Sequence, residues 1–105
     1  DGTLVMADCG SFEDAQRAAR AGVDIVSTTL AGYTGDRVKT DGPDLELLRE
    51  VVAAFPDVPV ICEGRVHTPE QAAAAIEAGA FAVIVGTAIT HPTSITTWFK
   101  AAVEG

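Results

Sequence analysis

The chain has 105 residues, of which 48% are hydrophobic and 21% charged, and its formal net charge is −8. This composition predicts one small globular domain with a core of its own and excludes a disordered chain. Its seven Lys and Arg residues are too few for a nucleic-acid or anionic-membrane surface, and no apolar run approaches the ~20 residues of a membrane span. We therefore expect a cytoplasmic protein with an acidic surface.

The first unit begins close to the start of the chain. Asp1-Gly2-Thr3 has no basic n-region, so no signal peptide is predicted, and the missing initiator Met is typical of a processed or truncated chain. A strand is expected at Leu4-Val5-Met6-Ala7, followed by a helix over 12–21. Ser11 is the expected N-cap of this helix, and Gly22 is its expected C-terminal stop.

The second unit contains a long connection. Residues 24–28 are expected to form the second strand, and a helix with hydrophobic residues at helical spacing is expected over 44–55. The polar, glycine-containing segment 29–43 separates them. At about fifteen residues this loop is long for a compact domain, and such loops are usually functional or mobile.

The third and fourth units repeat the pattern. A strand at Val60-Ile61-Cys62 precedes the helix-start signal Thr68-Pro69-Glu70-Gln71, and Gly79 is expected to end that helix. A strand at 82–85 comes next. Pro92 opens the last helix, whose apolar stripe we interpret as core packing; the stripe consists of Ile95, Trp98, Phe99 and Ala102.

Strand and helix thus alternate four times, which predicts a parallel sheet with right-handed crossovers. A shift of 57 residues places Ser11 on Thr68, Gly22 on Gly79 and Val26 on Val83. Units one and three are therefore built alike, as expected in a barrel of repeated units.

Four strand–helix units do not close a barrel, because a (β/α)8 barrel needs eight. The predicted fold class is α/β, as the parallel (β/α)4 half of a TIM barrel, with residues 1–105 forming one half of a single domain. The open edges predict a partner, which is either the rest of a longer barrel or a second copy of the chain. A flavodoxin-like sheet with helices on both faces is the alternative.

The carboxyl ends of parallel strands are where such folds bind ligands. Glu63 follows the third strand, and alternation turns it to the same side as Ile61, with Val60 and Cys62 toward the helices. An inward carboxylate among apolar residues is expected to have a raised pKa, which suits proton transfer. The competing interpretation is an ion pair, either with Arg65 or with a residue of another strand that this chain does not contain.

Other strand ends carry further candidates. Asp8 follows the first strand and is expected to orient a sugar hydroxyl or pair with a cation; a helix-start or loop carboxylate is the competing interpretation. Gly64 and Gly86 allow backbone N–H groups to approach an anion, and the loops after the last two strands of a barrel often form a phosphate site. Tight turns also use glycine. His67 and His91 are expected near helix starts at the surface.

The two cysteines give little support to a metal site. Cys9 and Cys62 form no C-x-x-C motif and lie far along the chain from His67 and His91. We therefore expect no metal and interpret both cysteines as buried thiols in a reducing compartment.

Several peptides at these strand ends form a specific combination. They are Met6-Ala7-Asp8, then 25–34 with the sequence I-V-S-T-T-L-A-G-Y-T, Gly42-Pro43-Asp44, 60–69 with V-I-C-E-G-R-V-H-T-P, and 85–92 with V-G-T-A-I-T-H-P. Together and in this order they resemble the N-acetylmannosamine-6-phosphate 2-epimerase family, over essentially the whole chain.

The resemblance implies strands five to eight of a TIM barrel in cytoplasmic amino-sugar and sialic acid catabolism. It implies interconversion of N-acetylmannosamine 6-phosphate and N-acetylglucosamine 6-phosphate through the C2 proton, without a redox cofactor. Site residues follow by matching motifs. Glu63 is the expected catalytic glutamate; the expected substrate-binding residues are Asp8, Thr28, Thr29 and Arg65; the expected phosphate-binding residues are Gly64, Gly86, Thr87 and His91.

Two departures from the family pattern accompany this resemblance. The family's catalytic lysine lies on an earlier strand, whereas the lysines here are Lys39, in a loop, and Lys100, in the final helix. His91 stands where relatives usually have arginine, which predicts a weaker phosphate contact because histidine is only partly charged near neutrality. We therefore expect the chain alone to be inactive, with another phosphosugar barrel enzyme or a self-pairing, non-catalytic phosphate-binding half-barrel as alternatives.

Overall fold

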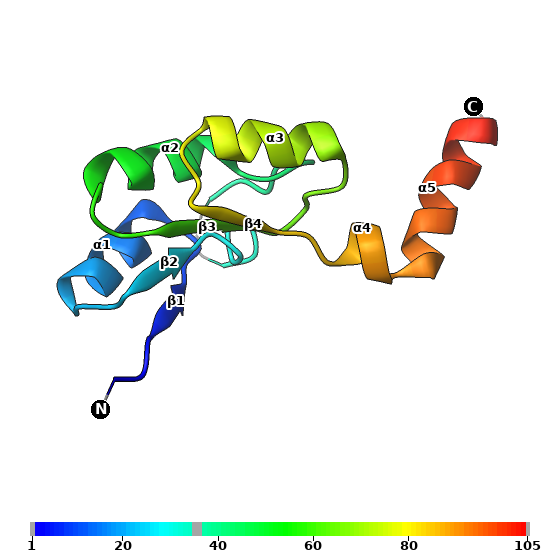
Figure 1. The fold of residues 1–105 in the computed structure, drawn as a ribbon. Coiled ribbons are helices and arrows are strands. Elements are labelled where there is room, and N and C mark those ends of the chain that lie inside the picture. Colours follow the sequence, from blue (N-terminus) through cyan, green and yellow to red (C-terminus); the bar gives the residue numbers. More distant parts are fainter. Residues whose placement is uncertain (1, 35–36, 105) are drawn as a thin grey trace.

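The computed structural model describes residues 2–34 and 37–104. Four strands alternate with helices along the chain, and a short helix precedes the last one (Figure 1). In order they are β1 (Met6–Asp8), α1 (Phe12–Arg20), β2 (Ile25–Ser27), α2 (Leu45–Ala54), β3 (Val60–Glu63), α3 (Pro69–Glu77), β4 (Ala82–Ile84), α4 (Thr87–Thr90) and α5 (Pro92–Glu104).

The four strands form one parallel sheet in the order β1-β2-β3-β4. Asp8 pairs with Ser27, Ser27 with Ile61, and Glu63 with Ile84. Each strand thus lies beside the next one in the sequence, as in a barrel wall, whereas a flavodoxin-like sheet changes direction within its strand order. The predicted four-unit parallel α/β arrangement is confirmed, and the doubly wound alternative is wrong.

Helices α1, α2 and α3 all cover the same face of this sheet (Figure 1). Ala15 of α1, Leu48 of α2 and Ala75 of α3 are fully buried in one cluster with Val26 and Cys62 of the strands. Phe12 and Phe55 stack at the edge of this cluster with ring centroids 5.9 Å apart. The core of the described chain therefore lies between these three helices and one side of the sheet.

The helix starts follow their predicted caps. Ser11 accepts a hydrogen bond from the Asp14 N–H at 3.1 Å, and Asp44 caps α2 in the same way through the Leu47 N–H. Thr68 and Gln71 form a complete capping box at α3. Each cap satisfies backbone donors that have no partner within the first turn, which fixes where each helix leaves the strand ends.

The repeat in the sequence is also a repeat in the structure. The shift from Ser11 to Thr68 carries α1 onto α3 and β2 onto β4, residue for residue. Gly22 and Gly79 end the two helices with φ angles of 88° and 108°, which favour glycine. Strands β1 and β3 do not superimpose by this shift, since β3 begins three residues earlier than the shifted β1.

The opposite face of the sheet is not covered by helices (Figure 1). Met6 is 45% exposed and Ile84 is 41% exposed on this face, which we call the open face, and Ile61 lies outside the helix-facing cluster. Val60 and Cys62 belong to that cluster. The predicted alternation along β3 is therefore confirmed.

Three sequence-based expectations need correction. The first strand is Met6–Asp8 rather than 4–7, because parallel pairing with β2 starts at Met6 opposite Ile25. Helix α4 was not predicted. The stripe of α5 is not core: α5 extends away from the sheet (Figure 1), has no buried residue, and leaves Phe99 71% exposed.

No helix in the described part of the chain is long and apolar enough to cross a membrane.

Candidate functional site

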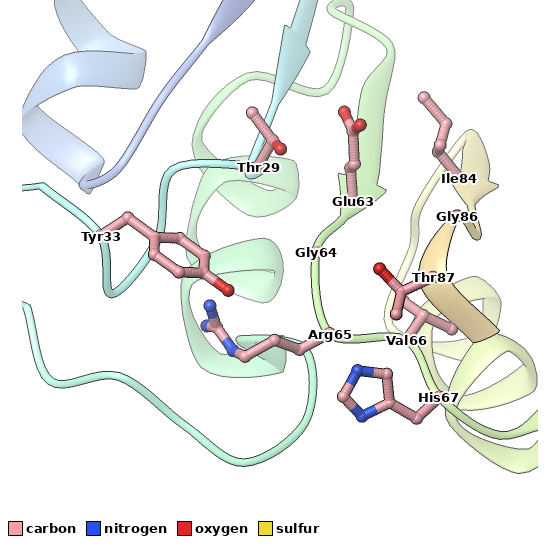
Figure 2. A pocket seen from close by; sticks show the side chains of 10 residues that line it. All are labelled: Thr29, Tyr33, Glu63, Gly64, Arg65, Val66, His67, Ile84, Gly86 and Thr87. Carbon is pink, nitrogen blue, oxygen red and sulfur yellow. The ribbon is translucent and has the colours of Figure 1, made fainter. Parts of the chain in front are cut away.

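A pocket of about 240 Å³ opens at the carboxyl ends of β2, β3 and β4. Its walls come from the loops after these strands (Figure 2). The lining residues are Thr29, Tyr33, Glu63, Gly64, Arg65, Val66, His67, Ile84, Gly86 and Thr87. Six of the nine residues proposed from the sequence are among them, so most of the residues expected at the strand ends lie around one cavity.

Glu63 is the carboxylate at the inner end of this pocket. It is half-buried, and the Ser27 hydroxyl donates a hydrogen bond to Glu63 Oε2 at 3.3 Å. The Ser27 oxygen also accepts from the Thr29 N–H at 3.3 Å. Ser27 thus links the ends of β2 and β3 and fixes one carboxylate oxygen, leaving Glu63 placed to exchange a proton with a bound molecule.

Arg65 does not pair with Glu63, and no ion pair to Glu63 is found among residues 2–34 and 37–104. Instead, Arg65 Nε donates to the Gly42 carbonyl at 3.1 Å, and Nη2 to Thr40 Oγ1 at 3.4 Å. Both acceptors belong to the long loop after β2. The competing interpretation of Glu63 as an ion-pair partner of Arg65 is therefore wrong.

The third guanidinium nitrogen of Arg65 has no such partner. Nη1 is buried and has no hydrogen-bond acceptor within the described residues. The backbone of Arg65 is left-handed with φ 58°, directly after Gly64 with φ 105°. A non-glycine residue in this region is strained and is found most often where a site requires it.

Tyr33 closes the pocket on the β2 side. The Arg65 guanidinium lies 4.9 Å and Lys39 Nζ lies 4.6 Å from its ring centroid. Hydrogen bonding to Arg65 is the largest cause of a lowered Tyr33 pKa, and the positive charges of Arg65 and Lys39 act in the same direction, against burial. Tyr33 was not proposed as a site residue from the sequence, although it lies in the quoted 25–34 peptide.

Gly86 and Thr87 form the β4 side of the pocket. A Cβ added at Gly86 would meet no atom within 4 Å, so the backbone here is open to a ligand. Gly86 is also the N-cap of α4, which the sequence had not predicted. A short extra helix after the last strand is a frequent part of the phosphate site in (β/α)8 barrels.

Three proposed residues lie outside the pocket. Asp8 is exposed at the end of β1, on the open face of the sheet. Thr28 is 3% exposed and hydrogen-bonds with the Cys62 thiol on the helix-covered side. Alternation explains this, because Thr29 lines the pocket and Ser27 hydrogen-bonds with Glu63, while Thr28 between them faces the helices.

His91 is the third of these residues and acts in helix capping. Its Nδ1 accepts a hydrogen bond from the Ser94 N–H at 3.3 Å, with Ser94 Oγ 2.6 Å from the same nitrogen. His67, by contrast, lines the pocket while its ring packs on Trp98 with centroids 4.5 Å apart. The sequence placed both histidines at the surface near helix starts, and the family resemblance singled out only His91.

The cysteines take no part in the pocket. Cys9 and Cys62 are free and buried, as predicted. Burial is the main cause of a raised pKa for both thiols, and the hydrogen bond with Thr28 partly offsets it at Cys62. Thiols with raised pKa values are poor nucleophiles. No group of three or more His, Cys, Asp or Glu side chains in residues 2–34 and 37–104 is arranged to hold a metal ion.

Comparisons with known proteins place this pocket in a family context. The NanE family model, described as "Putative N-acetylmannosamine-6-phosphate epimerase", matches residues 1–105. A protein of Cutibacterium acnes named "Putative N-acetylmannosamine-6-phosphate 2-epimerase" is 60% identical over 96% of this chain and 44% of its own length. A relative of the same name from Caldanaerobacter subterraneus is 51% identical over 91% of this chain and 40% of its own length.

The solved structure of the N-acetylmannosamine-6-phosphate 2-epimerase from Clostridium perfringens superimposes with a TM-score of 0.91 at 44% identity. The match covers 96% of this chain and 44% of that chain. The chain therefore spans less than half the length of the relatives it matches, and it corresponds to their C-terminal portion.

Proposed function

Because the chain belongs to the N-acetylmannosamine-6-phosphate epimerase family, we propose that it forms one wall of an epimerase site in a TIM barrel. The substrate would be a phosphorylated amino sugar, and the reaction would interconvert N-acetylmannosamine 6-phosphate and N-acetylglucosamine 6-phosphate. These 105 residues would supply strands five to eight of a single barrel domain. A cytoplasmic location is part of the same proposal.

The chemistry follows from the acidity of the sugar at C2. In the opened sugar, C2 lies next to the C1 carbonyl, so removal of its proton gives an enolate whose negative charge lies on the C1 oxygen, with the acetamido group still on C2. Return of a proton to the opposite face inverts C2, and no electrons are gained or lost. Glu63 would hold or move a proton in this sequence, because its carboxylate lies in the pocket with one oxygen fixed by Ser27.

Phosphate recognition would fall to the other side of the pocket. Gly64, Gly86 and Thr87 line it, and the open backbone at Gly86 suits the approach of an anion. Thr29 and Arg65 would contact the sugar. Asp8, Thr28 and His91 remain proposed site residues from the family resemblance, with Asp8 on the open face and the other two held in contacts outside the pocket.

One observation carries this proposal. The Glu63 carboxylate and the glycine-containing loops after β3 and β4 line the same cavity at the carboxyl ends of neighbouring parallel strands. A carboxylate there supplies proton transfer, while the loops supply anion binding, and a 2-epimerase acting on a sugar phosphate needs both.

The open face of the sheet explains why this wall would not act alone. Met6, Ile61 and Ile84 lie on it, and in a closed barrel such residues fill the interior. The opposite wall would come from four further strand–helix units, including the lysine that the resemblance assigns to an earlier strand. A second copy of this chain is the alternative partner.

Epimerisation assays test the proposal. N-acetylmannosamine 6-phosphate would be supplied to this chain alone and to the chain mixed with the first four strand–helix units of the Cutibacterium acnes relative. We expect turnover only in the mixture. Turnover by the isolated chain would contradict the need for a second wall, whereas a dimer mass with phosphosugar binding and no turnover would favour the self-pairing half-barrel.

Glu63→Gln in the active mixture separates binding from chemistry. The amide keeps the shape of the side chain but cannot exchange the same proton, so the rate should fall by about 10²–10⁴-fold while binding is retained. A rate within a few-fold of the unchanged mixture would remove Glu63 from the chemistry.

A further inference from the structure

The long loop after β2 and the turn after β3 meet at a cluster of three side chains. Tyr33 lies in this loop, and two cations lie less than 5 Å from its ring centroid. The distances are 4.6 Å for Lys39 Nζ and 4.9 Å for Arg65 Cζ. Figure 2 shows Tyr33 and the Arg65 guanidinium facing each other on the β2 side of the pocket, away from Gly86 and Thr87 on the β4 side.

Two of the three nitrogens of the Arg65 guanidinium donate hydrogen bonds to protein acceptors. Nε and Nη2 donate to Gly42 and Thr40, and the Tyr33 ring holds the group from another direction. Nη1 is buried without an acceptor in the described residues. Leaving a buried charged donor unpaired is costly. Because Arg65 lines the pocket, a molecule bound there is a candidate source of the missing acceptor.

The backbone supports the same conclusion. Arg65 adopts φ 58°, a conformation that a glycine or asparagine would adopt at lower cost. The loop that holds it is itself closed tightly, since a Cβ added at Gly32 would lie 2.6 Å from Lys39 Cα. The turn after β3 thus adopts a left-handed backbone at Arg65, and the loop after β2 packs tightly at Gly32. Both features fix the position of the Arg65 guanidinium.

From these contacts we propose that Tyr33 is a positioning residue that holds Arg65 so that its Nη1 donates to an oxygen of the sugar, on the side of the pocket opposite α4. This inference rests on the proposed function, since it takes the bound sugar phosphate as the source of that oxygen. Arg65 touches the ligand, and Tyr33 acts through Arg65. Lys39, on the same loop, is the other charged group facing the Tyr33 ring.

The pH dependence gives Tyr33 a distinct signature. As a neutral phenol it leaves the Arg65 charge available to the ligand. Above its lowered pKa the phenolate pairs with Arg65 and competes with the sugar oxygen, so affinity should fall as the pH rises through that pKa. Removing the hydroxyl should remove this alkaline loss.

The coupling of Tyr33 to Arg65 is testable without any ligand. Tyr33 is the single tyrosine of the chain, so tyrosinate absorbance during an alkaline titration reports this side chain alone. We expect Arg65→Gln to raise the Tyr33 pKa measurably, with Arg49→Gln on the outer surface of α2 as the matched control. Equal titration curves for the unchanged chain and Arg65→Gln would overturn the proposal.

Ligand binding tests the second step. N-acetylglucosamine 6-phosphate and, separately, inorganic phosphate would be titrated calorimetrically into the mixture described above, at neutral and alkaline pH. Tyr33→Phe should weaken sugar-phosphate binding roughly threefold at neutral pH and Arg65→Lys roughly tenfold or more, because a hydrogen bond to a charged group is lost or misplaced. Inorganic phosphate binding should change in neither variant.

Three results would count against the proposal. If Arg65→Lys weakens the binding of both probes equally, Arg65 contacts the phosphate. If affinity still falls at alkaline pH in Tyr33→Phe, a group other than Tyr33 causes that fall. The variant Lys39→Met then tests whether this group is Lys39. Unchanged sugar-phosphate binding in Tyr33→Phe would remove its positioning role. If the unchanged mixture binds neither probe, the proposed function fails, while the tyrosine titration still decides the coupling.

Discussion

The two faces of the sheet differ in both packing and chemistry. On the helix-covered face, Val26 and Cys62 are fully buried against α1, α2 and α3. On the open face, Met6 and Ile84 remain nearly half exposed, and the same face carries Glu63. The covered face is complete within the described chain, whereas the open face would be completed by the proposed second wall. The residues that stabilise the chain and those of the proposed site therefore lie on opposite sides of one sheet.

The largest effect should come from the covered face. Leu48 is fully buried in α2, so Leu48→Ala should lower the free energy of unfolding of the chain by about 2–5 kcal/mol, through lost burial and the cavity left behind. Urea denaturation followed by circular dichroism measures this. A loss below about 1 kcal/mol would show that the helix-covered cluster is not what stabilises the chain.

A smaller effect is expected where the covered face meets the long loop after β2. Asp44 is buried, caps α2 and pairs with Arg37, and hydrogen bonding to Arg37 is the largest cause of its lowered pKa. Asp44→Ala should therefore cost about 2–3 kcal/mol, from a lost cap and a buried arginine left without its partner. Glu46→Ala, in the first turn of the same helix and exposed, is the matched control.

The same carboxylate predicts an acid dependence. Because the folded pKa of Asp44 lies below the ordinary value of 3.8, its contribution is fully present above that value and is lost as the pH falls through the folded pKa. Unfolding free energies measured from pH 5 downward should decline, and the decline should be shallower in Asp44→Ala. Parallel curves for the two proteins would contradict this assignment.

A helix cap should matter less than either. Thr68→Ala removes the hydroxyl of the capping box at α3 and should destabilise the chain by about 1 kcal/mol. Ser11→Ala at the equivalent position of α1 should cost a similar amount, since the two units are built alike. Chemical denaturation of both variants checks this, and costs differing by more than about 1 kcal/mol would break the equivalence of the two units.

The smallest effect is expected on the open face. Met6→Ala should change the stability of the isolated chain by no more than about 0.5 kcal/mol, because the side chain is largely exposed there. In the mixture with the first four units, the same change should cost more, since Met6 would then be inside a barrel. Equal costs in both preparations would indicate that this face stays uncovered.

Most of the fold could be predicted because its signals are local. Caps such as Thr68, the glycine stops and the apolar strands fix each element from neighbouring residues alone. The 57-residue repeat in the sequence also predicted that units one and three are built alike. Helix α4 was missed because residues 87–90 carry no cap or apolar spacing that marks a helix, and the packing of α5 was wrongly predicted because an apolar stripe does not specify its partner.

The site was predictable only where a strand fixed the direction of a side chain. Glu63 follows from alternation along β3, and the same rule applied to β2 would have selected Ser27 and Thr29 over Thr28. Tyr33 lies in a long loop, where no periodicity indicates that it meets Arg65 from another loop. His91 carries the residue type of a ligand, but its Nδ1 accepts a hydrogen bond from Ser94 in the first turn of α5, the helix that it precedes.

The left-handed backbone of Arg65 also bears on how this protein can be engineered. Arg65→Gly or Arg65→Asn would relieve a backbone conformation that costs a branched or long side chain about 1 kcal/mol or more, so a search for thermostable variants would favour them. Both changes remove the guanidinium at the pocket. If Arg65 binds the sugar as proposed, position 65 is a stability–activity trade-off, and selection for heat resistance alone would erode that binding.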